Sequence, residues 1–261
     1  MGKLVYSLHT QPIRQGRWNQ GDKYIETIKM FQLSILQASR FHDIELYISD
    51  SDAFLFDSLP ADIKTLNNPP NNLFWTTSKI EAIERTQGKF IHIDGDVFLS
   101  KPLPDFDRII VERVEKQQFN KHYLSQLNRI AHHLQELPFF TMLDYSFNHG
   151  VVGFADSNKK TVYIENYNVW MNQLKSVAKQ MSEPNIIIEQ YLLACLSQQN
   201  QWSVDVLLPG HTLEQQNQQA IEKGYVHLYG ISKYKDVWKK RIDDRFRQNY
   251  PIIYRNLMKK L

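Results

Sequence analysis

Short apolar runs alternate with helical patterns through the first third of the chain. The runs at 4–9, 44–48 and 90–93 predict three β-strands. Between them, apolar residues recur at steps of three or four over 25–38, and residues 76–86 form a second helical segment. This order of strand, helix, strand, helix and strand is typical of a parallel sheet covered by helices.

The remainder of the chain extends this pattern without an internal repeat or a low-complexity tract. Asn185 is expected to cap a helix that carries Glu189 and Gln190. We therefore predict an α/β fold with a Rossmann-type, mostly parallel sheet flanked by helices. The further strands are predicted at 109–114 and 147–154, and the further helices at 123–137, 161–180 and 185–198.

Composition agrees with a soluble globular protein. The chain has 261 residues, of which 42% are hydrophobic and 23% charged, so it can bury a core without disulfides or a structural metal. Its single cysteine excludes an intramolecular disulfide framework and a multi-cysteine zinc site. No apolar run approaches the ~20 residues that span a bilayer, and the N-terminus resembles a first strand rather than a signal peptide. We expect a cytoplasmic protein.

The charge is concentrated at the C-terminus. Residues 235–261 contain nine basic and three acidic side chains, whereas the whole chain carries only +3. We predict a catalytic body over 1–234 and a basic, aromatic helical tail over 235–261. The tail either packs its aromatic residues on the body or contacts the inner face of an anionic membrane peripherally. The mildly acidic body argues against nucleic acid as a partner.

Two aspartates, Asp94 and Asp96, follow the predicted strand 90–93 and flank Gly95. Ligands of parallel α/β sheets bind beyond the carboxyl ends of the strands, and a divalent cation relieves the repulsion between two carboxylates. Gly95 allows an unusual backbone angle and the close approach of a ligand. The alternative is a polar turn with both aspartates solvated.

A second group of polar residues lies near the C-terminus, at His227, Gly230 and Lys233. A neutral imidazole is a common metal ligand, and a lysine can neutralise a phosphate held by the same metal. Taken alone, the segment could equally be an ordinary surface loop.

Together, Asp94-x-Asp96 and His227-x-x-Gly230-x-x-Lys233 resemble the motifs of GT-A-fold glycosyltransferases, in particular the retaining family of glycogenin and the lipopolysaccharide galactosyltransferases. The segment from Phe147 to Val152 resembles that family's sugar-pocket segment, and Glu189-Gln190 resembles its Asp-Gln pair. The sequence departs from the family at Glu189, which is one methylene longer, and after Lys233, where Tyr-Lys replaces Pro-Trp.

The resemblance implies a function and a set of site residues. Asp94, Asp96 and His227 would ligate manganese, with magnesium as the alternative, and the metal would bind the diphosphate of a nucleotide sugar, a UDP-sugar in this family. Glu189 and Gln190 would lie beside the anomeric carbon as catalytic groups. The residues implied for donor binding are Ser7, His9, Thr10, Lys79, Asp94, Gly95, Asn148, Gly150, Gly230 and Lys233.

The leading hypothesis is therefore a metal-dependent hexosyltransferase of polysaccharide biosynthesis that moves a sugar from a nucleotide-sugar donor to a saccharide or glycolipid acceptor, with retention implied by the resemblance. One alternative is a non-catalytic module that binds a sugar nucleotide or a glycan. Another is a haloacid-dehalogenase-type phosphatase, which also uses paired aspartates but places them after its first strand.

Overall fold

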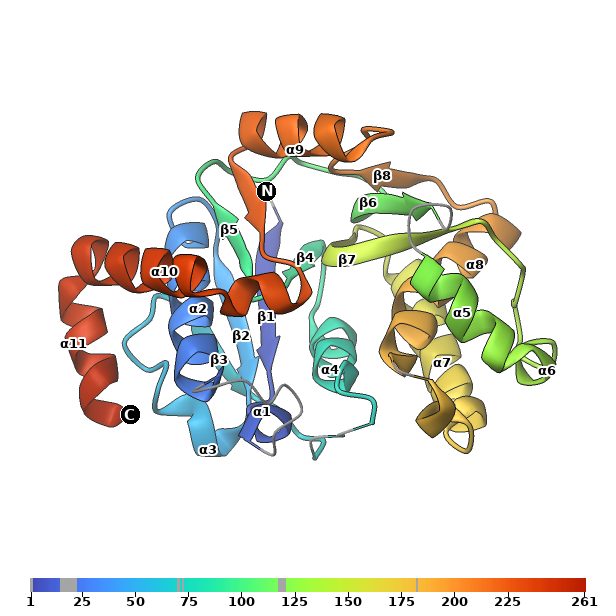
Figure 1. The fold of residues 1–261 in the computed structure, drawn as a ribbon, viewed down its shortest axis with the longest axis horizontal. Helices are drawn as coiled ribbons and strands as arrows, with labels where there is room; N and C mark the ends of the chain where they lie inside the picture. Colours follow the sequence, from blue (N-terminus) through green and yellow to red (C-terminus); the bar gives the residue numbers. More distant parts are fainter. Residues whose placement is uncertain (1, 15–22, 70, 72, 117–120, 182) are drawn as a thin grey trace.

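A mixed sheet forms the middle of the molecule in the computed structural model, which describes residues 2–14, 23–69, 71, 73–116, 121–181 and 183–261 (Figure 1). The strands are β1 (Lys3–Leu8), β2 (Ile44–Ile48), β3 (Asp62–Thr65), β4 (Phe90–Ile93), β5 (Val97–Leu99), β6 (Ile109–Lys116), β7 (Tyr145–Phe154), β8 (Val204–Val206) and β9 (Tyr225–His227). Within the described residues, seven strands pair in the order β3-β2-β1-β4-β7-β6-β8, and β5 pairs with β9 in a small second sheet.

The predicted mostly parallel α/β fold is confirmed. Neighbouring strands from β3 to β4 are parallel, as are β6 and β8, whereas β7 is antiparallel to both of its neighbours. The helices are α1 (Gln11–Arg14), α2 (Lys23–Ala38), α3 (Asp50–Ala53), α4 (Thr77–Arg85), α5 (Lys121–Arg129), α6 (Ala131–Leu134), α7 (Ser157–Leu174), α8 (Leu192–Gln199), α9 (Leu213–Glu222), α10 (Asp236–Asn249) and α11 (Pro251–Lys260), with 3-10 turns η1 (Ala178–Gln180) and η3 (Gly230–Tyr234) and a π-helix η2 (Ile186–Tyr191).

Helices cover both faces of the sheet, so the core has two parts. Alternate residues of β1 point to opposite faces, with Val5 in one cluster and Leu4 and Tyr6 in the other. The first cluster includes α7, η2 and α8, and the second includes α2 and the C-terminal helices. Burial on both faces explains why β2 and β4 are apolar except at Glu45 and His92, rather than alternating with exposed polar residues.

Two local predictions were wrong. The helix predicted over 123–137 is divided into α5 and α6, because Ile130 between them has φ −118° and ψ 19°, outside the helical region. Asn185 does not cap its own helix: its Oδ1 accepts hydrogen bonds from the backbone N–H and the hydroxyl of Thr76, at 3.2 and 3.0 Å. Asn185 thereby joins the start of α4 to the segment that carries Glu189.

The basic tail packs on the body. Figure 1 shows α10 lying across α2, and these helices are in contact. Phe246 and Leu257 are buried in the second cluster, and Trp238 packs against it. Lys29 of α2 pairs with Asp243 of α10 at 2.8 Å. The tail aromatics therefore face the protein, and contact of the basic side chains with an anionic membrane stays a prediction.

Among the described residues, no helix combines the length and the apolar character that a membrane crossing requires.

Candidate metal and donor-binding site

The two aspartates lie in a tight turn at the carboxyl end of β4. This strand pairs with β1 on one side and β7 on the other, so the turn is near the middle of the sheet. The backbone N–H of Val97 donates to the carbonyl of Asp94 at 3.0 Å and closes the turn. The N–H of Asp94 donates to the carbonyl of Gly150 at 3.0 Å and ties the turn to β7.

His227 reaches this turn through the small second sheet. β5 begins directly after Asp96 and runs antiparallel to β9, with Val97 opposite His227. The carboxylate oxygens of Asp94 and Asp96 and a ring nitrogen of His227 all lie within 4.8 Å of one another. The structure thus brings the three predicted metal ligands together, and two carboxylates with one imidazole form a donor set that suits a divalent cation such as manganese.

Each aspartate is paired with a lysine. Nζ of Lys79 lies 2.8 Å from Oδ1 of Asp94, and Nζ of Lys233 contacts Oδ2 of Asp96. Burial alone would raise the pKa of Asp96, but Lys233 and His227 outweigh it and hold that pKa well below its usual range. Burial and the charge of Asp96 raise the pKa of Asp94 despite Lys79. The pair therefore resists carrying two charges, and a bound cation would favour full ionisation of both.

Glu112, in β6, is a site residue that sequence reasoning missed. It is fully buried, and its Oε2 accepts a hydrogen bond from Nδ1 of His227 at 2.7 Å. Burial alone would lower the pKa of His227, but the charges of Glu112 and Asp96 raise it to about 10. The one signal in the sequence was a carboxylate inside an apolar strand, since a buried carboxylate requires a partner.

Glu189 lies behind Lys79 in a buried ion cluster. Nζ of Lys79 donates to Oε1 of Glu189 at 2.9 Å and to the carbonyl of His149 at 3.0 Å, and Nδ1 of His149 lies 3.2 Å from the same Oε1. Burial would raise the pKa of Glu189, but Lys79 and His149 lower it to about 2. Gln190 follows on the same π-helix and is partly exposed. π-helical turns are frequent at functional sites.

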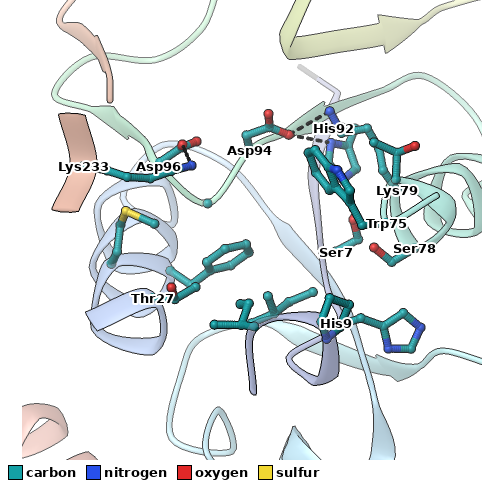
Figure 2. A pocket seen from close by; sticks show the side chains of 17 residues that line it. Ser7, His9, Thr27, Trp75, Ser78, Lys79, His92, Asp94, Asp96 and Lys233 are labelled. Carbon is teal, nitrogen blue, oxygen red and sulfur yellow. Dashed lines mark hydrogen bonds and ion pairs between the residues drawn. The ribbon is translucent and has the colours of Figure 1, made fainter. Parts of the chain in front are cut away.

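A pocket opens between the first strand, α2 and the Asp94–Asp96 turn. Figure 2 shows the two aspartates along one edge and His9 at the opposite edge, with Thr27 of α2 also lining it. Of the predicted donor-binding residues, the pocket is lined by Ser7, His9, Lys79, Asp94, Gly95 and Lys233, together with the metal ligand Asp96.

Other predicted donor-binding residues lie elsewhere. The hydroxyl of Thr10 donates to the buried carboxylate of Asp52, so this hydroxyl contributes to the stability of the fold. The amide of Asn148 donates to Oε1 of Glu115 at 2.8 Å and accepts from the N–H of Gly150 at 2.9 Å. Neither Asn148 nor Gly150 lines the pocket.

The glycines act for different reasons. Gly95 does not have a positive φ, so it does not use the backbone angles that only glycine allows. A Cβ at Gly95 would lie 2.2 Å from the ring of Phe31, and a Cβ at Gly150 would lie 2.1 Å from Oε2 of Glu112. Gly230 has φ 51°, a left-handed conformation that favours glycine, and it does not line the donor pocket.

A second cavity, of about 730 Å³, lies beside the metal ligands. Arg113 and Glu115 of β6 form one wall, Gln216 of α9 another, and Tyr229 lies between the cavity and His227. The ring of Tyr229 is covered by His227, 4.1 Å away between ring centroids, and by the guanidinium of Arg113, 4.1 Å from the ring centroid. These contacts hold Tyr229 in place, and the polar side chains stand in a lining that also includes Val114, Val206 and Leu208.

Several glycosyltransferases are among the solved structures with a similar fold. The galactosyltransferase LgtC, solved with donor and acceptor sugar analogues, matches with a TM-score of 0.52 and 12% identity over 93% of this chain and 94% of its own. GlyE of Streptococcus pneumoniae matches with 0.51 and 10% over 100% of this chain and 64% of its own. The bifunctional WbbM matches with 0.52 and 9% over 98% and 52%. This chain therefore spans less than two-thirds of GlyE and about half of WbbM.

The likenesses show that the chain has the GT-A glycosyltransferase fold, as its motifs predicted. No curated protein sequence matches it. Residues 27–260 match the family of unknown function DUF6734, and the chain belongs to that family.

Proposed function

We propose that this chain is a metal-dependent glycosyltransferase that takes a sugar from a nucleotide sugar, a UDP-sugar in the first instance, and transfers it to a saccharide or glycolipid acceptor. The observation that carries the proposal is the convergence of Asp94, Asp96 and His227 within 4.8 Å at the edge of a pocket formed beside the first strand. The GT-A fold supports it, because ligands of open α/β sheets bind beyond the carboxyl ends of the strands, where this site lies.

Asp94, Asp96 and His227 would hold the divalent cation, manganese or alternatively magnesium. When bound, the cation supplies Lewis-acid stabilisation of the charge on the leaving diphosphate. Lys233 adds a fixed positive charge at the same place, because its ammonium already lies on Asp96. Ser7 and His9 also line the pocket, away from the two aspartates (Figure 2), where the nucleoside would lie.

Glu189 and Gln190 take separate roles in this proposal. Glu189 is buried and paired with Lys79, so it positions Lys79 and, through it, Asp94. Gln190 is the partly exposed member of the pair and is the candidate to face the sugar. Transfer with retention is proposed on the motif resemblance alone, and the anomeric proton of the product, observed by NMR, tests it.

The second cavity is the proposed acceptor site. Its volume of about 730 Å³ is in the range of small-molecule sites, and it lies across Tyr229 and Glu112 from the metal ligands. The side chains of Arg113, Glu115 and Gln216 in its lining offer both donors and acceptors to sugar hydroxyls.

Thermal unfolding with a panel of nucleotide sugars, with and without manganese, tests the proposal. A ligand at 100 times its Kd stabilises the native state by about 2.7 kcal/mol, which is readily detected. We expect one nucleotide sugar to stabilise the protein only with manganese, and Asp96→Asn to lose this effect. Asp105→Asn, an aspartate outside the site, is the matched control and should keep it.

The alternatives give other results. Stabilisation by a nucleotide sugar without hydrolysis or transfer would indicate a non-catalytic binding module. Release of phosphate from a generic phosphomonoester, without nucleotide binding, would indicate a phosphatase. A well-folded protein that no nucleotide stabilises would overturn the glycosyltransferase proposal.

A further inference from the structure

We propose that Glu112 is the positioning residue of the metal site: its buried carboxylate holds the His227 ring so that Nε2 points at the aspartate carboxylates. The inference rests on the proposed metal-dependent function. It assigns a role to a residue of β6 that belongs to neither recognised motif.

The hydrogen bond selects one ring nitrogen. A carboxylate accepts, so Nδ1 of His227 carries the proton in its 2.7 Å contact with Oε2 of Glu112. Nε2 is then the nitrogen that faces the other ligands, 3.3 Å from Oδ1 of Asp96. In a neutral ring protonated at Nδ1, the lone pair is on Nε2, and metal-binding histidines commonly donate their second nitrogen to a carboxylate in this way.

The carboxylate of Glu112 is itself fixed by contacts with neighbouring side chains. Its Oε1 accepts from the hydroxyl of Tyr229 and lies 3.2 Å from the guanidinium of Arg113. Its side chain is fully buried. The pairing of β6 with β7 is irregular between Val111 and Arg113, and such irregularities re-aim a side chain.

Gly150 of β7 completes the enclosure. A Cβ at Gly150 would lie 2.1 Å from Oε2 of Glu112 and 2.4 Å from Cε1 of His227. Carboxylate and imidazole therefore fill the space that a side chain at Gly150 would take. Close packing on this face prevents the ring from rotating to present Nδ1 to a metal.

The cost of burying Glu112 is consistent with this role. A buried carboxylate is expensive unless it is paired, and apolar residues of the same size are often as stabilising. The residues before it in β6, Ile109 to Val111, are apolar and buried. If position 112 only had to pack in the core, another apolar residue would be sufficient. The imidazole of His227, by contrast, requires a hydrogen-bond acceptor at this position.

Manganese affinity measured by electron paramagnetic resonance, with UDP present, tests the proposal without activity. We expect Glu112→Ala to weaken manganese binding by about 10–100-fold, the range for loss of such an outer partner. Glu112→Gln should lose much less, because an amide oxygen can still accept from Nδ1. Glu45→Gln, which alters a buried ion-paired carboxylate of β2, should bind manganese as the unchanged protein does.

A second readout needs no metal. The Nδ1 proton of His227, assigned against a His227→Gln variant, should give a slowly exchanging downfield NMR signal that disappears in Glu112→Ala and persists in Glu45→Gln. Folding of each variant is checked by its thermal transition, and Glu112→Leu, an apolar residue of similar size that cannot accept from Nδ1, replaces the alanine variant if that variant fails to fold.

Two outcomes in a folded Glu112→Ala variant would overturn the proposal: an unchanged manganese affinity, or survival of the Nδ1 signal. Equal losses of manganese affinity in the alanine and glutamine variants would also overturn it, because they would show an effect of charge rather than of ring orientation. Failure of the unchanged protein to bind manganese would instead overturn the proposed function, and the Nδ1 signal would still decide what Glu112 does.

Discussion

The backbone of Val97 pairs with that of His227 across the two-stranded sheet of β5 and β9. The N–H of Leu228, directly after β9, also donates to the carbonyl of Asp96, directly before β5, at 3.0 Å. These contacts attach the C-terminal motif to the aspartate turn through main-chain atoms. The position of the His227 imidazole therefore depends on the pairing of two three-residue strands.

Replacing Lys79 with methionine should strongly destabilise the fold. Lys79 is buried between Asp94 and Glu189, so its loss leaves two carboxylates without their cation. Breaking a buried pair in this way costs about 3–5 kcal/mol, and adding Glu189→Gln should recover part of the loss. Urea unfolding measures both variants, with Lys89→Met, in an exposed ion pair, as the control. A loss below about 1 kcal/mol would show that water screens the cluster.

Thr27→Val should stabilise the protein and weaken nucleotide binding. Thr27 is buried and lines the donor pocket, and its hydroxyl has no hydrogen-bond partner among the described residues. An apolar isostere removes that unsatisfied group, for a gain of up to about 1 kcal/mol. The matched control is Thr10→Val, which removes the hydrogen bond to Asp52 and should destabilise. If both variants lose the same stability in urea, the Thr27 hydroxyl has a partner and the prediction is wrong.

Gly150→Ala should damage the metal site as well as the fold. The added methyl group overlaps Glu112 and His227, and overpacking of this kind costs about 1–3 kcal/mol. Gly88→Ala is the control, because Gly88 has φ 74° and no atom within 4 Å of its Cβ position, so only backbone strain of about 1–2 kcal/mol is added. Both variants should unfold at lower urea concentration, but only Gly150→Ala should bind manganese more weakly. Equal manganese affinity in the two would contradict the packing argument.

The contact of the tail with the body should weaken in acid. Burial would raise the pKa of Asp243, but its hydrogen bonds from Lys29 and the Tyr254 hydroxyl lower it. A carboxylate with a lowered folded-state pKa stabilises above its unfolded value of about 3.9, and the contribution is lost as pH falls through the folded value.

Urea unfolding of Asp243→Asn from neutral pH downward measures this contribution. At neutral pH the variant should be less stable by about 0.5–1 kcal/mol, and the difference should shrink as the pH falls below about 4. Asp244→Asn, in an exposed pair with Arg247, should show little of either effect. A difference independent of pH would show that the Asp243 carboxylate is not the source.

The central strands of the main sheet were predictable, and the three-residue strands of the second sheet were not. The strands at 44–48 and 90–93 were predicted with the bounds that β2 and β4 have, because both are buried on both faces and flanked by polar turns. β5 and β9 escaped prediction because three residues are too few for a periodic signal. They are held by their pairing with each other, which is a property of the folded chain.

Some residues of the site were also predictable from the sequence, and others were not. Asp94, Asp96, His227 and Lys233 could be proposed from residue type and order, and the structure brings them together. Glu112 could not, because nothing along β6 indicates which residue a buried carboxylate contacts. Gly95 lines the donor pocket, and nothing in the sequence indicated that the ring of Phe31 occupies the space a Cβ there would take.

The sequence by itself determined the α/β class, the main strands and the residue types that could bind a metal and a diphosphate, because hydrophobic periodicity and side-chain chemistry are local properties. Only the tertiary structure decided that His227 meets the aspartate turn, that Glu112 orients it, and that Lys79 is shared by Asp94 and Glu189. These relationships join residues far apart along the chain, and they depend on strand pairing and close packing in the folded protein.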